Sequence, residues 1–427
     1  MAIFNLQKGL FKIKELISGN QVTLNLKQIE SHFKGNGNDN DLNNLLKHAV
    51  KTTVFYKEFD VQSINHFPVI NKTQIKEHFS HFRSNEFLDK PLVEMTTSGS
   101  TGTPFTVFQN VEKKQRNLAD TFYFANLAGY ELGQRLFYFK IWAKAKMAPD
   151  YQYRLQNIVP FDVLKLDDET IQRFIGEVEN NNKGEHAVLG YVSALESIIR
   201  YCDKINKTSF KAGFKSMITM SEGLSTVTKE KLSTLFNCPV VSRYSNLENG
   251  IIAQQLINEE RFLINTASYF VEIMHFESDK VLSYGEKGRI VVTDLFNYAM
   301  PLIRYDTGDI GVIVKGDDGK MFLSSVEGRK LDLIFDTNDQ LVSSYIVYKN
   351  MWQYKEISQY QLIQVGQKEY VFKINCSSDF SNENKLIEEF KSYLGKDADF
   401  KVEYVDEIPL LDSGKRRKIV NLYKSTI

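Results

Sequence analysis

Residues 96–104, TTSGSTGTP, combine glycines with hydroxyl side chains in a way that could bind phosphate. Glycine permits the positive φ angles that turn successive backbone N–H groups toward one point, and Ser and Thr hydroxyls add further donors. The next residues, FTVFQN (105–110), alternate apolar and polar types as a strand does. No lysine follows the glycines, so this is not a P-loop of the GxxxxGK[ST] kind. A polar turn between two strands would explain the same residues.

A second stretch, SRYSNLENG (242–250), places a tyrosine and a carboxylate after the strand-like run PVV. The flat face of Tyr244 could stack on a purine, and Glu248 could bind a metal ion held by phosphate. The structural alternatives are that Tyr244 packs in the core and that Glu248 faces solvent.

A third stretch, PLIRYDTGDIG (301–311), contains Asp306 and Asp309 on either side of a predicted Thr-Gly turn. A carboxylate fixed at such a turn can accept hydrogen bonds from both hydroxyls of a ribose. The other acidic ligands of a calcium loop are missing, and an Asx turn without a ligand is the structural alternative.

The fourth stretch, IPLLDSGKRRKIV (408–420), lies near the C-terminus. Its Ser-Gly turn is predicted to present Lys415 at the tip of a loop. Most basic runs are solvated surface, but a lysine that must enter and leave an active site suits a mobile small domain.

In the first part of the chain, the elements that must position these residues are helices and strands in alternation. Apolar residues recur at helical spacing in 171–178 and 195–202, and β-branched runs typical of strands lie at 239–245, 289–295 and 311–315. This mixture through about the first 325 residues predicts an α/β fold.

The pattern changes after about residue 330. Strand-like runs at 369–375 and 399–405 flank a predicted amphipathic helix around Leu386, Phe390 and Leu394. These residues predict a compact α+β unit of about one hundred residues. The candidate boundary is EGRKLDLI (327–334).

Composition excludes several classes of protein. The 427 residues include 53 basic and 53 acidic side chains, which disfavours nucleic acid or an anionic membrane as the main partner. No stretch approaches the roughly 18 consecutive apolar residues of a membrane span. The three cysteines are far apart, which disfavours a disulfide framework or a cysteine zinc site. These features predict a cytoplasmic protein.

In their order and spacing, five stretches together resemble the adenylate-forming superfamily of acyl-CoA synthetases, nonribosomal-peptide adenylation domains and luciferases. They are TSGSTGTP (97–104), YSNLEN (244–249), DTGD (306–309), GRKLD (328–332) and SGK (413–415). The resemblance covers nearly the whole chain. It implies a large multi-sheet adenylation domain (1–327), a hinge (328–332) and a small mobile α+β domain (333–427).

Two more stretches, FPVINKTQI (67–75) and GYVSALESI (190–198), are similar to the phenylacetate-CoA ligase and capsule-biosynthesis branch. Phe105, where other members have a lysine, fits this branch. The implied reaction has two steps: a carboxylate attacks the α-phosphate of ATP to give an acyl-adenylate and pyrophosphate, and a thiol or amine then displaces AMP. The implied setting is the synthesis of surface polysaccharides or secondary metabolites.

The resemblance also implies a role for each residue that matches a motif. The β- and γ-phosphates would be held by Ser98, Gly99, Ser100, Thr101, Gly102 and Thr103. Tyr244, with Ser245 and Asn246 after it, would lie against adenine, and Glu248 would bind Mg²⁺.

The ribose would be held by Asp309 and Arg329. Lys415 would place a positive charge between the substrate carboxylate and the α-phosphate, where charge develops in the transition state. Ser221 and Glu222 would line the substrate pocket, because they sit where relatives have a turn beside adenine and the acyl group.

The sequence departs from the family at the hinge. Leu331 stands where relatives usually have an acidic residue or a lysine, and FDTNDQLVSS (335–344) replaces an Arg-Gly pair that helps to build the thiol tunnel of CoA ligases. CoA, the phosphopantetheine of a carrier protein and an amine therefore remain alternative acceptors.

Two other classes of function compete with this interpretation. A catalytically inactive member of the same fold would bind a nucleotide or a protein partner, but the presence of Lys415, Glu248 and Asp309 argues against it. A nucleic-acid ligase is disfavoured by the balanced charge.

Overall fold

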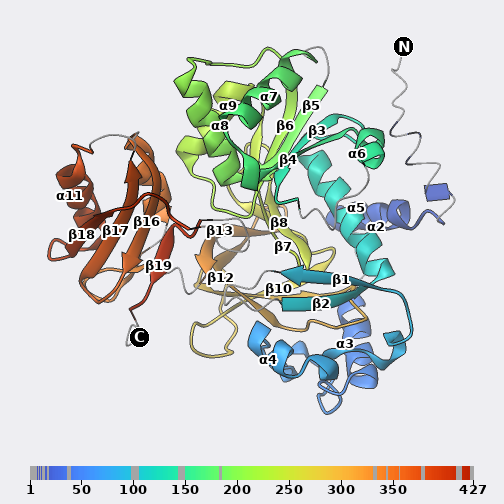
Figure 1. Cartoon of the computed structure of the whole chain (residues 1–427). Coiled ribbons are helices and arrows are strands. Elements are labelled where there is room, and N and C mark those ends of the chain that lie inside the picture. Colours follow the sequence, from blue (N-terminus) through green and yellow to red (C-terminus); the bar gives the residue numbers. More distant parts are fainter. Residues whose placement is uncertain are drawn as a thin grey trace. The chain divides into compact units, whose positions relative to one another are not determined.

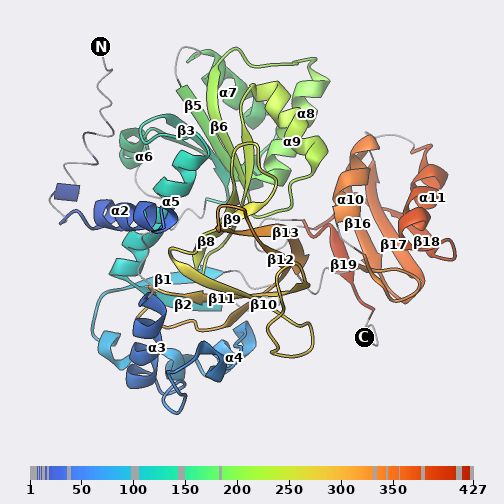
Figure 2. The same ribbon diagram turned by 180° about the vertical axis from the view of Figure 1, so that it is seen from behind.

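The computed structural model describes residues 7, 9, 11, 15–16, 19–35, 40–97, 105–142, 150–181, 185–329, 334–342, 345–354, 356–376, 380–409 and 416–423 (Figures 1 and 2). The chain divides into two compact units, one of residues 1–222 and 231–326 and the other of residues 223–230 and 327–427. The predicted domain limits at 327 and 333 remain a prediction.

The strands that begin in the first unit form an eleven-stranded sheet and a separate hairpin. They are β1 (Leu92–Thr97), β2 (Phe105–Asn110), β3 (Arg135–Lys140), β4 (Ile158–Asp162), β5 (Glu185–Tyr191), β6 (Gly213–Met220), β7 (Val240–Asn246), β8 (Gly250–Gln255), β9 (Phe262–Ile264), β10 (Tyr269–Met274), β11 (Lys287–Asp294), β12 (Tyr305–Lys315) and β13 (Met321–Arg329). In the large sheet the strand order is β10-β11-β12-β13-β9-β8-β7-β6-β5-β3-β4, and β1 pairs with β2 alone. These strands confirm the runs predicted at 105–110, 239–245, 289–295 and 311–315.

The helices of this part of the chain connect or precede those strands. They are α2 (Gln21–Phe33), α3 (Asp41–Thr52), η1 (Ile64–His66), α4 (Lys72–Glu77), η2 (Phe79–Phe82), η3 (Asn85–Phe87), α5 (Val111–Leu127), α6 (Asp150–Gln156), η5 (Val163–Lys165), α7 (Asp168–Glu179), α8 (Val192–Lys204) and α9 (Thr226–Phe236). Each apolar stripe predicted at 171–178 and 195–202 is buried, in α7 and α8 respectively. Both helical predictions are therefore confirmed.

The parallel part of the sheet, β7-β6-β5-β3-β4, is covered on both faces (Figure 1). On one face, Phe174 of α7 makes edge-to-face contacts with Phe137 and Phe139 of β3. On the other face, Ala125 of α5 and Ala128, the C-cap residue that follows it, pack into a cluster with Leu189, Ile218 and Val241 of three parallel strands. Parallel strands that are buried on both faces carry the nearly continuous apolar runs that the sequence shows.

The N-terminal segment closes another core in which residues far apart in sequence meet. Side chains of α3, of residues 56–82 and of the hairpin pack against residues at the start of β12. The cluster includes Phe67, Ile70 and Phe105 on one side and Ile303 and Tyr305 on the other. The hairpin register pairs Thr97 with Phe105, so β1 ends and β2 begins side by side.

The second unit contains the predicted α+β arrangement. Its elements are β14 (Ile334–Phe335), β15 (Leu341–Val342), α10 (Tyr345–Asn350), η7 (Met351–Gln353), β16 (Ile357–Gln364), β17 (Glu369–Cys376), α11 (Glu383–Leu394), β18 (Asp399–Tyr404) and β19 (Ile419–Asn421). Four strands form a sheet in the order β18-β17-β16-β19. Leu386, Phe390 and Leu394 of α11 are buried in its core, as their spacing predicts.

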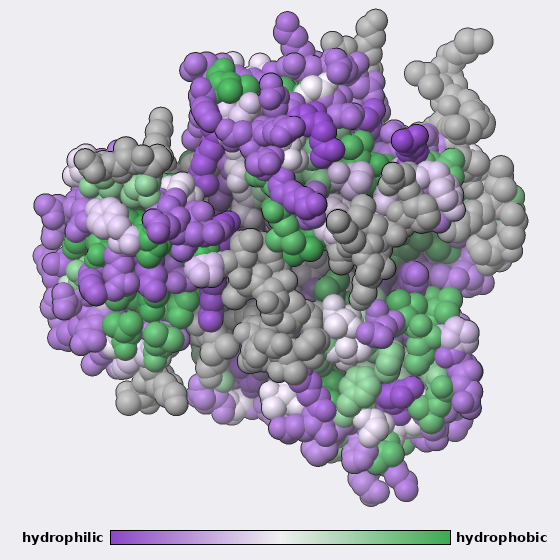
Figure 3. All heavy atoms as spheres, in the orientation of Figure 1, coloured by the Kyte–Doolittle hydropathy of each residue, from purple (hydrophilic) through white to green (hydrophobic). Residues whose placement is uncertain are grey.

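Hydrophilic side chains predominate on the face of the molecule in Figure 3, and hydrophobic ones form separate patches. Among the residues that the structure describes, no helix has the length and apolar character needed to cross a membrane.

Candidate functional site

Tyr244 and Asp309, predicted to contact the adenine and the ribose, are brought together from β7 and β12. The Tyr244 hydroxyl lies 2.7 Å from Asp309 Oδ2 and 3.2 Å from Thr307 Oγ1. Burial, reinforced by the Asp309 carboxylate, raises the pKa of Tyr244 well above its ordinary value, so the phenol keeps its proton and donates it. The Tyr244 ring also packs at the edge of a core cluster. The tyrosine therefore orients the carboxylate in addition to packing.

Asp309 belongs to a bulge within β12, at the position of the predicted Thr-Gly turn. Val291 of β11 pairs with Asp306 and Arg289 pairs with Ile310, so residues 307–309 face a single residue of β11. Gly308 has a φ of +80°, and its N–H donates to Asp306 Oδ1 at 2.8 Å. A glycine suits this position because side chains are strained at such angles. The Asx turn considered from the sequence is thus present inside a strand, and bulges of this kind often direct a side chain at an active site.

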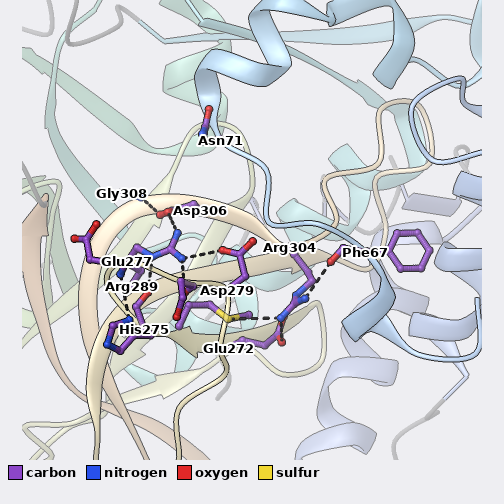
Figure 4. A network of polar contacts seen from close by, with 12 residues as sticks. Phe67, Asn71, Glu272, His275, Glu277, Asp279, Arg289, Arg304, Asp306 and Gly308 are labelled. Carbon is purple, nitrogen blue, oxygen red and sulfur yellow. Dashed lines mark hydrogen bonds and ion pairs between the residues drawn. The ribbon is translucent and has the colours of Figure 1, made fainter. Parts of the chain in front are cut away.

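A network of ion pairs holds β12 in place at this bulge (Figure 4). Arg289 Nη1 lies 2.6 Å from Asp306 Oδ2, and its Nη2 lies 3.0 Å from Asp279 Oδ1. Arg304, just before the strand, donates to both carboxylate oxygens of buried Glu272 at 3.2 Å. Asp306 is therefore paired with Arg289, whereas Asp309 accepts a hydrogen bond from Tyr244.

Glu248, the predicted metal ligand, is buried and not solvent-facing. Only 2% of its surface is exposed, and its Oε1 accepts a 2.7 Å hydrogen bond from the Tyr305 hydroxyl and lies 2.8 Å from Lys72 Nζ. Burial, together with this carboxylate, raises the pKa of Tyr305 well above its ordinary value. The solvent-exposed alternative for Glu248 is therefore wrong.

The turn between β7 and β8 fixes the backbone of Glu248. Asn246 Oδ1 accepts a hydrogen bond from the backbone N–H of Asn249 at 2.8 Å, and Gln109 Nε2 of β2 donates to the Glu248 carbonyl at 2.9 Å. Ser245 lies at a register shift between β7 and β8. Ser245 and Asn246 thus shape the turn that carries the carboxylate.

Lys72 reaches Glu248 because the segment before it pairs with the start of β12. The Ile70 N–H donates to the Arg304 carbonyl at 3.0 Å, and the Asp306 N–H donates to the Ile70 carbonyl at 2.8 Å. Asn71 then caps α4 in a capping box with Gln74, so Lys72 is the first residue of the helix. The two backbone bonds on either side of Tyr305 bring Lys72 and Tyr305 to the same carboxylate.

The residue that follows the predicted phosphate loop lies beside this cluster. Phe105, the first residue of β2, stacks on Tyr305 with ring centroids 6.4 Å apart, and Lys72 Nζ lies 5.3 Å from the centroid of the Phe105 ring. A lysine from another segment therefore lies over the residue that replaces the expected lysine. Thr97 pairs with Phe105, so the residues on either side of the predicted phosphate loop lie side by side.

Several predicted site residues lie outside the described residues. They are Lys415 and the loop residues Ser98, Gly99, Ser100, Thr101, Gly102 and Thr103. The proposed hinge is described only as far as Arg329, the last residue of β13, and not for its side chain.

Ser221 and Glu222 follow β6 directly, and Glu222 has a structural partner there. Its Oε2 accepts a hydrogen bond from the backbone N–H of Ser193 in the first turn of α8 at 2.7 Å. Ser221 has a φ of +72°, an unusual angle for a residue with a side chain. Burial, followed by the Glu222 charge, raises the pKa of nearby Tyr191. These residues tie the end of β6 to α8, and their role in a substrate pocket stays a prediction.

The described carboxylates fit Mg²⁺ that arrives with a nucleotide. In the part of the chain that the structure describes, no group of three or more His, Cys, Asp or Glu side chains could hold a metal. Mg²⁺ in nucleotide sites is commonly bound by one or two carboxylates together with substrate phosphates and water. Glu248 alone, near the residue that follows the predicted phosphate loop, suits that arrangement.

Sequence reasoning did not assign roles to Lys72 and Tyr305. Tyr305 stands directly before DTGD, and Lys72 belongs to FPVINKTQI, which was noted only as a mark of the branch. A lysine at the first position of a capped helix gave no signal of its own, because its partner lies far along the chain.

Comparisons with known proteins agree with this architecture. The family model of the CapK C-terminal domain matches residues 334–422. Protein CapK of Staphylococcus aureus is 24% identical over 398 residues, which cover 88% of this chain and 84% of that protein.

Two solved ligases share the fold. A 2-hydroxyisobutyryl-CoA ligase in the postadenylation state, in complex with 2-HIB-AMP, has a TM-score of 0.69 at 14% identity, covering 89% of this chain and 88% of that chain. The amide bond synthetase McbA of Marinactinospora thermotolerans has a TM-score of 0.55 at 16% identity, covering 77% and 68%. The chain therefore has the fold of the adenylate-forming ligases, as the sequence predicts.

Proposed function

We propose that this protein activates a carboxylic acid with ATP and transfers the acyl group to a thiol or an amine. The observation that supports this most strongly is that side chains of β7, of the turn after it, of β12 and of α4 form two polar groups. One is Tyr244 with Asp309, and the other is Glu248 with Tyr305 and Lys72. The residue that follows the glycine-rich loop adjoins the second group.

In the proposed first step, a carboxylate oxygen of the acid attacks the α-phosphorus of ATP. The bond from that phosphorus to the oxygen bridging to the β-phosphate breaks, and pyrophosphate leaves. Asp309, held by the Tyr244 hydroxyl, accepts hydrogen bonds from the ribose hydroxyls. Glu248 would hold Mg²⁺, whose charge neutralises the phosphates when it is bound. Ser98 to Thr103 hold the β- and γ-phosphates, with Arg329 at the ribose, and Lys415 stabilises the charge that develops at the α-phosphate.

In the proposed second step, a thiol or an amine attacks the acyl carbon and loses its proton, and AMP leaves with the bonding electrons. The CoA-ligase and amide-synthetase neighbours represent both kinds of acceptor. We therefore propose CoA, a carrier-protein phosphopantetheine and an amine as alternative acceptors. The similarity to Protein CapK and to the capsule-biosynthesis branch leads us to propose synthesis of a surface polysaccharide, in the cytoplasm, as the setting.

An exchange assay tests the first step without knowledge of the acceptor. Radiolabelled pyrophosphate, ATP and Mg²⁺ are incubated with the protein and a panel of carboxylic acids. We expect acid-dependent label in ATP and an acyl-adenylate detectable by mass spectrometry. ATP binding without exchange for any acid would favour the alternative of a catalytically inactive nucleotide-binding protein.

Replacing Asp309 with asparagine should raise the KM for ATP by about 10- to 100-fold, because hydrogen bonds to a charged acceptor contribute roughly 1.5–3 kcal/mol. The amide can still accept from the Tyr244 hydroxyl, so the bulge should persist. The assay is pyrophosphate exchange at varied ATP concentration. Asp318→Asn, on an exposed turn, is the control and should leave the KM unchanged. An unaltered KM for Asp309→Asn would remove Asp309 from the ribose site.

A further inference from the structure

Arg243, next to Tyr244 on β7, is a buried cation without a carboxylate partner among the described residues. Only 7% of the surface of Arg243 is exposed. Its Nε donates a hydrogen bond to Gln254 Oε1 at 2.8 Å, whereas its Nη2 is buried and makes no hydrogen bond. Gln254 is itself held by a 2.7 Å hydrogen bond to the Phe124 carbonyl. A buried guanidinium normally pairs with an anion, because the desolvation of an unpaired charge is costly.

The strand registers place Arg243 in a row of side chains at the carboxyl edge of the parallel sheet. Tyr191 of β5 pairs with Met220 of β6, and Met220 pairs with Arg243. Phe139 pairs with Gly190, so Lys140, the next residue of β3, continues the same row beside Tyr191. Laterally paired residues share one face of a sheet, so both cations lie on the same face.

That face is the one covered by α5. The residues two positions before the members of the row are Tyr138, Leu189, Ile218 and Val241. They pack together with Ala125 of α5 and with the alanine that caps the C-terminus of this helix. Alternate residues of a strand point to the same side, so the row lies directly above this apolar cluster. The arrangement combines an apolar floor with two cations at the edge where open α/β sheets bind ligands.

Lys140 adds a second positive charge without a carboxylate partner in the described part of the chain. Its Nζ lies 4.3 Å from the centroid of the Trp142 ring and 4.8 Å from that of Tyr138. Burial lowers the pKa of Lys140, and burial also lowers the pKa of Arg243 to about 10. The Arg243 guanidinium therefore stays charged at neutral pH and would attract an incoming anion.

We propose that Arg243, assisted by Lys140, binds a second anionic group of the carboxylic acid substrate, so that the substrate class is a dicarboxylic acid. This inference rests on the proposed function and narrows it. One carboxylate of the substrate reacts with ATP, its carbon chain lies on the apolar cluster, and the distal carboxylate accepts from Arg243. The anion supplies the partner that Nη2 lacks.

The test compares dianionic acids with monoanionic analogues in pyrophosphate exchange. The acids are malonate, succinate, glutarate and adipate, each beside its methyl half-ester, with 3-phosphonopropionate to separate a distal phosphonate from a distal carboxylate. At least one diacid should exceed its half-ester in kcat/KM by on the order of 100-fold, because an unmatched buried charge is strongly disfavoured. Preference for 3-phosphonopropionate over every dicarboxylate would overturn the assignment of a carboxylate.

Arg243→Met should reduce kcat/KM for that diacid to near the value for its half-ester, mainly through KM. Arg243→Lys should restore part of the preference. The methionine variant should fold with an equal or higher melting temperature, because it replaces an uncompensated buried charge by an apolar side chain. Arg135→Met is the matched control: Arg135 begins β3 at the opposite edge, pairs with Glu177, and should not affect discrimination.

Calorimetric titration of each acid into wild type and Arg243→Met separates this inference from the proposed function. Exchange that is equally fast with half-esters would overturn the inference and leave the function intact. Diacid binding that requires Arg243 but gives no exchange would contradict the function and support the inference. If no diacid binds and no acid supports exchange, both are wrong.

Discussion

Replacing Glu248 with glutamine is expected to lower the rate of acid-dependent pyrophosphate exchange by about 10²- to 10³-fold, the usual effect of losing one preorganised electrostatic contact at a reacting centre. Glutamine preserves the shape of the side chain and can still accept the hydrogen bond from Tyr305. It removes the negative charge that attracts Lys72 and that would hold Mg²⁺ against the phosphates. The loss should therefore appear in catalysis and in the Mg²⁺ concentration needed for half-maximal rate.

The fold of the Glu248→Gln variant should be nearly unchanged, because the Lys72 side chain is 37% exposed and can be solvated when its partner becomes neutral. Glu259→Gln provides the control. Glu259 pairs with Arg261 at the surface of the same unit and should leave exchange and its Mg²⁺ dependence as in the wild type. If Glu248→Gln retained full rate at every Mg²⁺ concentration, the proposed role of the carboxylate would be wrong.

Replacing Lys113 with methionine should destabilise the first unit by about 3–5 kcal/mol, the typical cost of removing one member of a buried ion pair. Lys113 is fully buried on α5, with Nζ 2.8 Å from Asp294 Oδ2 and 3.0 Å from the Tyr269 hydroxyl. Without the ammonium, the buried carboxylate of Asp294 loses its cationic partner and keeps a 3.0 Å hydrogen bond from the Phe296 N–H. Burial already raises the pKa of Asp294, which shows how poorly this environment accommodates its negative charge.

Urea unfolding followed by circular dichroism measures this loss as a lower midpoint of the first unit's transition. The double variant Lys113→Met/Asp294→Leu should recover much of the stability, because no charge is then left unpaired. Lys204→Met is the control, since Lys204 and Asp168 form an exposed pair. Exposed pairs contribute only about 0–1 kcal/mol. A midpoint for Lys113→Met equal to that of Lys204→Met would refute the argument.

The contacts of Lys113 also connect it to the backbone next to Glu248. Tyr269, which accepts from Lys113, donates to the Asn249 carbonyl at 2.6 Å, one residue after Glu248. A variant at Lys113 can therefore lose activity through the fold alone, and its exchange rate has to be compared at temperatures where it is folded.

Local pattern was enough to predict much of the fold. The stripe of apolar residues in α7 and the alternation in β2 depend on neighbours in sequence, and both elements form where they are predicted. Tyr244 and Asp309 were assigned to one site by resemblance, and their direct hydrogen bond was not predicted. The turn predicted at Thr307 and Gly308 is present, but its position in a bulge inside β12 could not be predicted, because a glycine with positive φ gives the same signal in a loop and in a bulge.

The contacts that sequence could not reveal are those between distant segments. Lys72 meets Glu248 only because Ile70 pairs beside Tyr305, and no periodicity in either segment encodes that partner. In the sequence, Arg243 looks like an ordinary strand residue. The structure shows that its Nη2 is buried and has no hydrogen-bond partner among the described residues. Register and burial carry this information, and both are tertiary properties.

The pairing of Ile70 with Tyr305 has a consequence for biogenesis. More than two hundred positions separate the two residues, so on the ribosome the early segment waits for its partner on the order of 10–50 s at usual elongation rates. Until then Phe67, Ile70 and the other apolar side chains of that segment stay without their final neighbours. Nascent chains of this protein should therefore depend on chaperones that shield such segments until translation has passed β12.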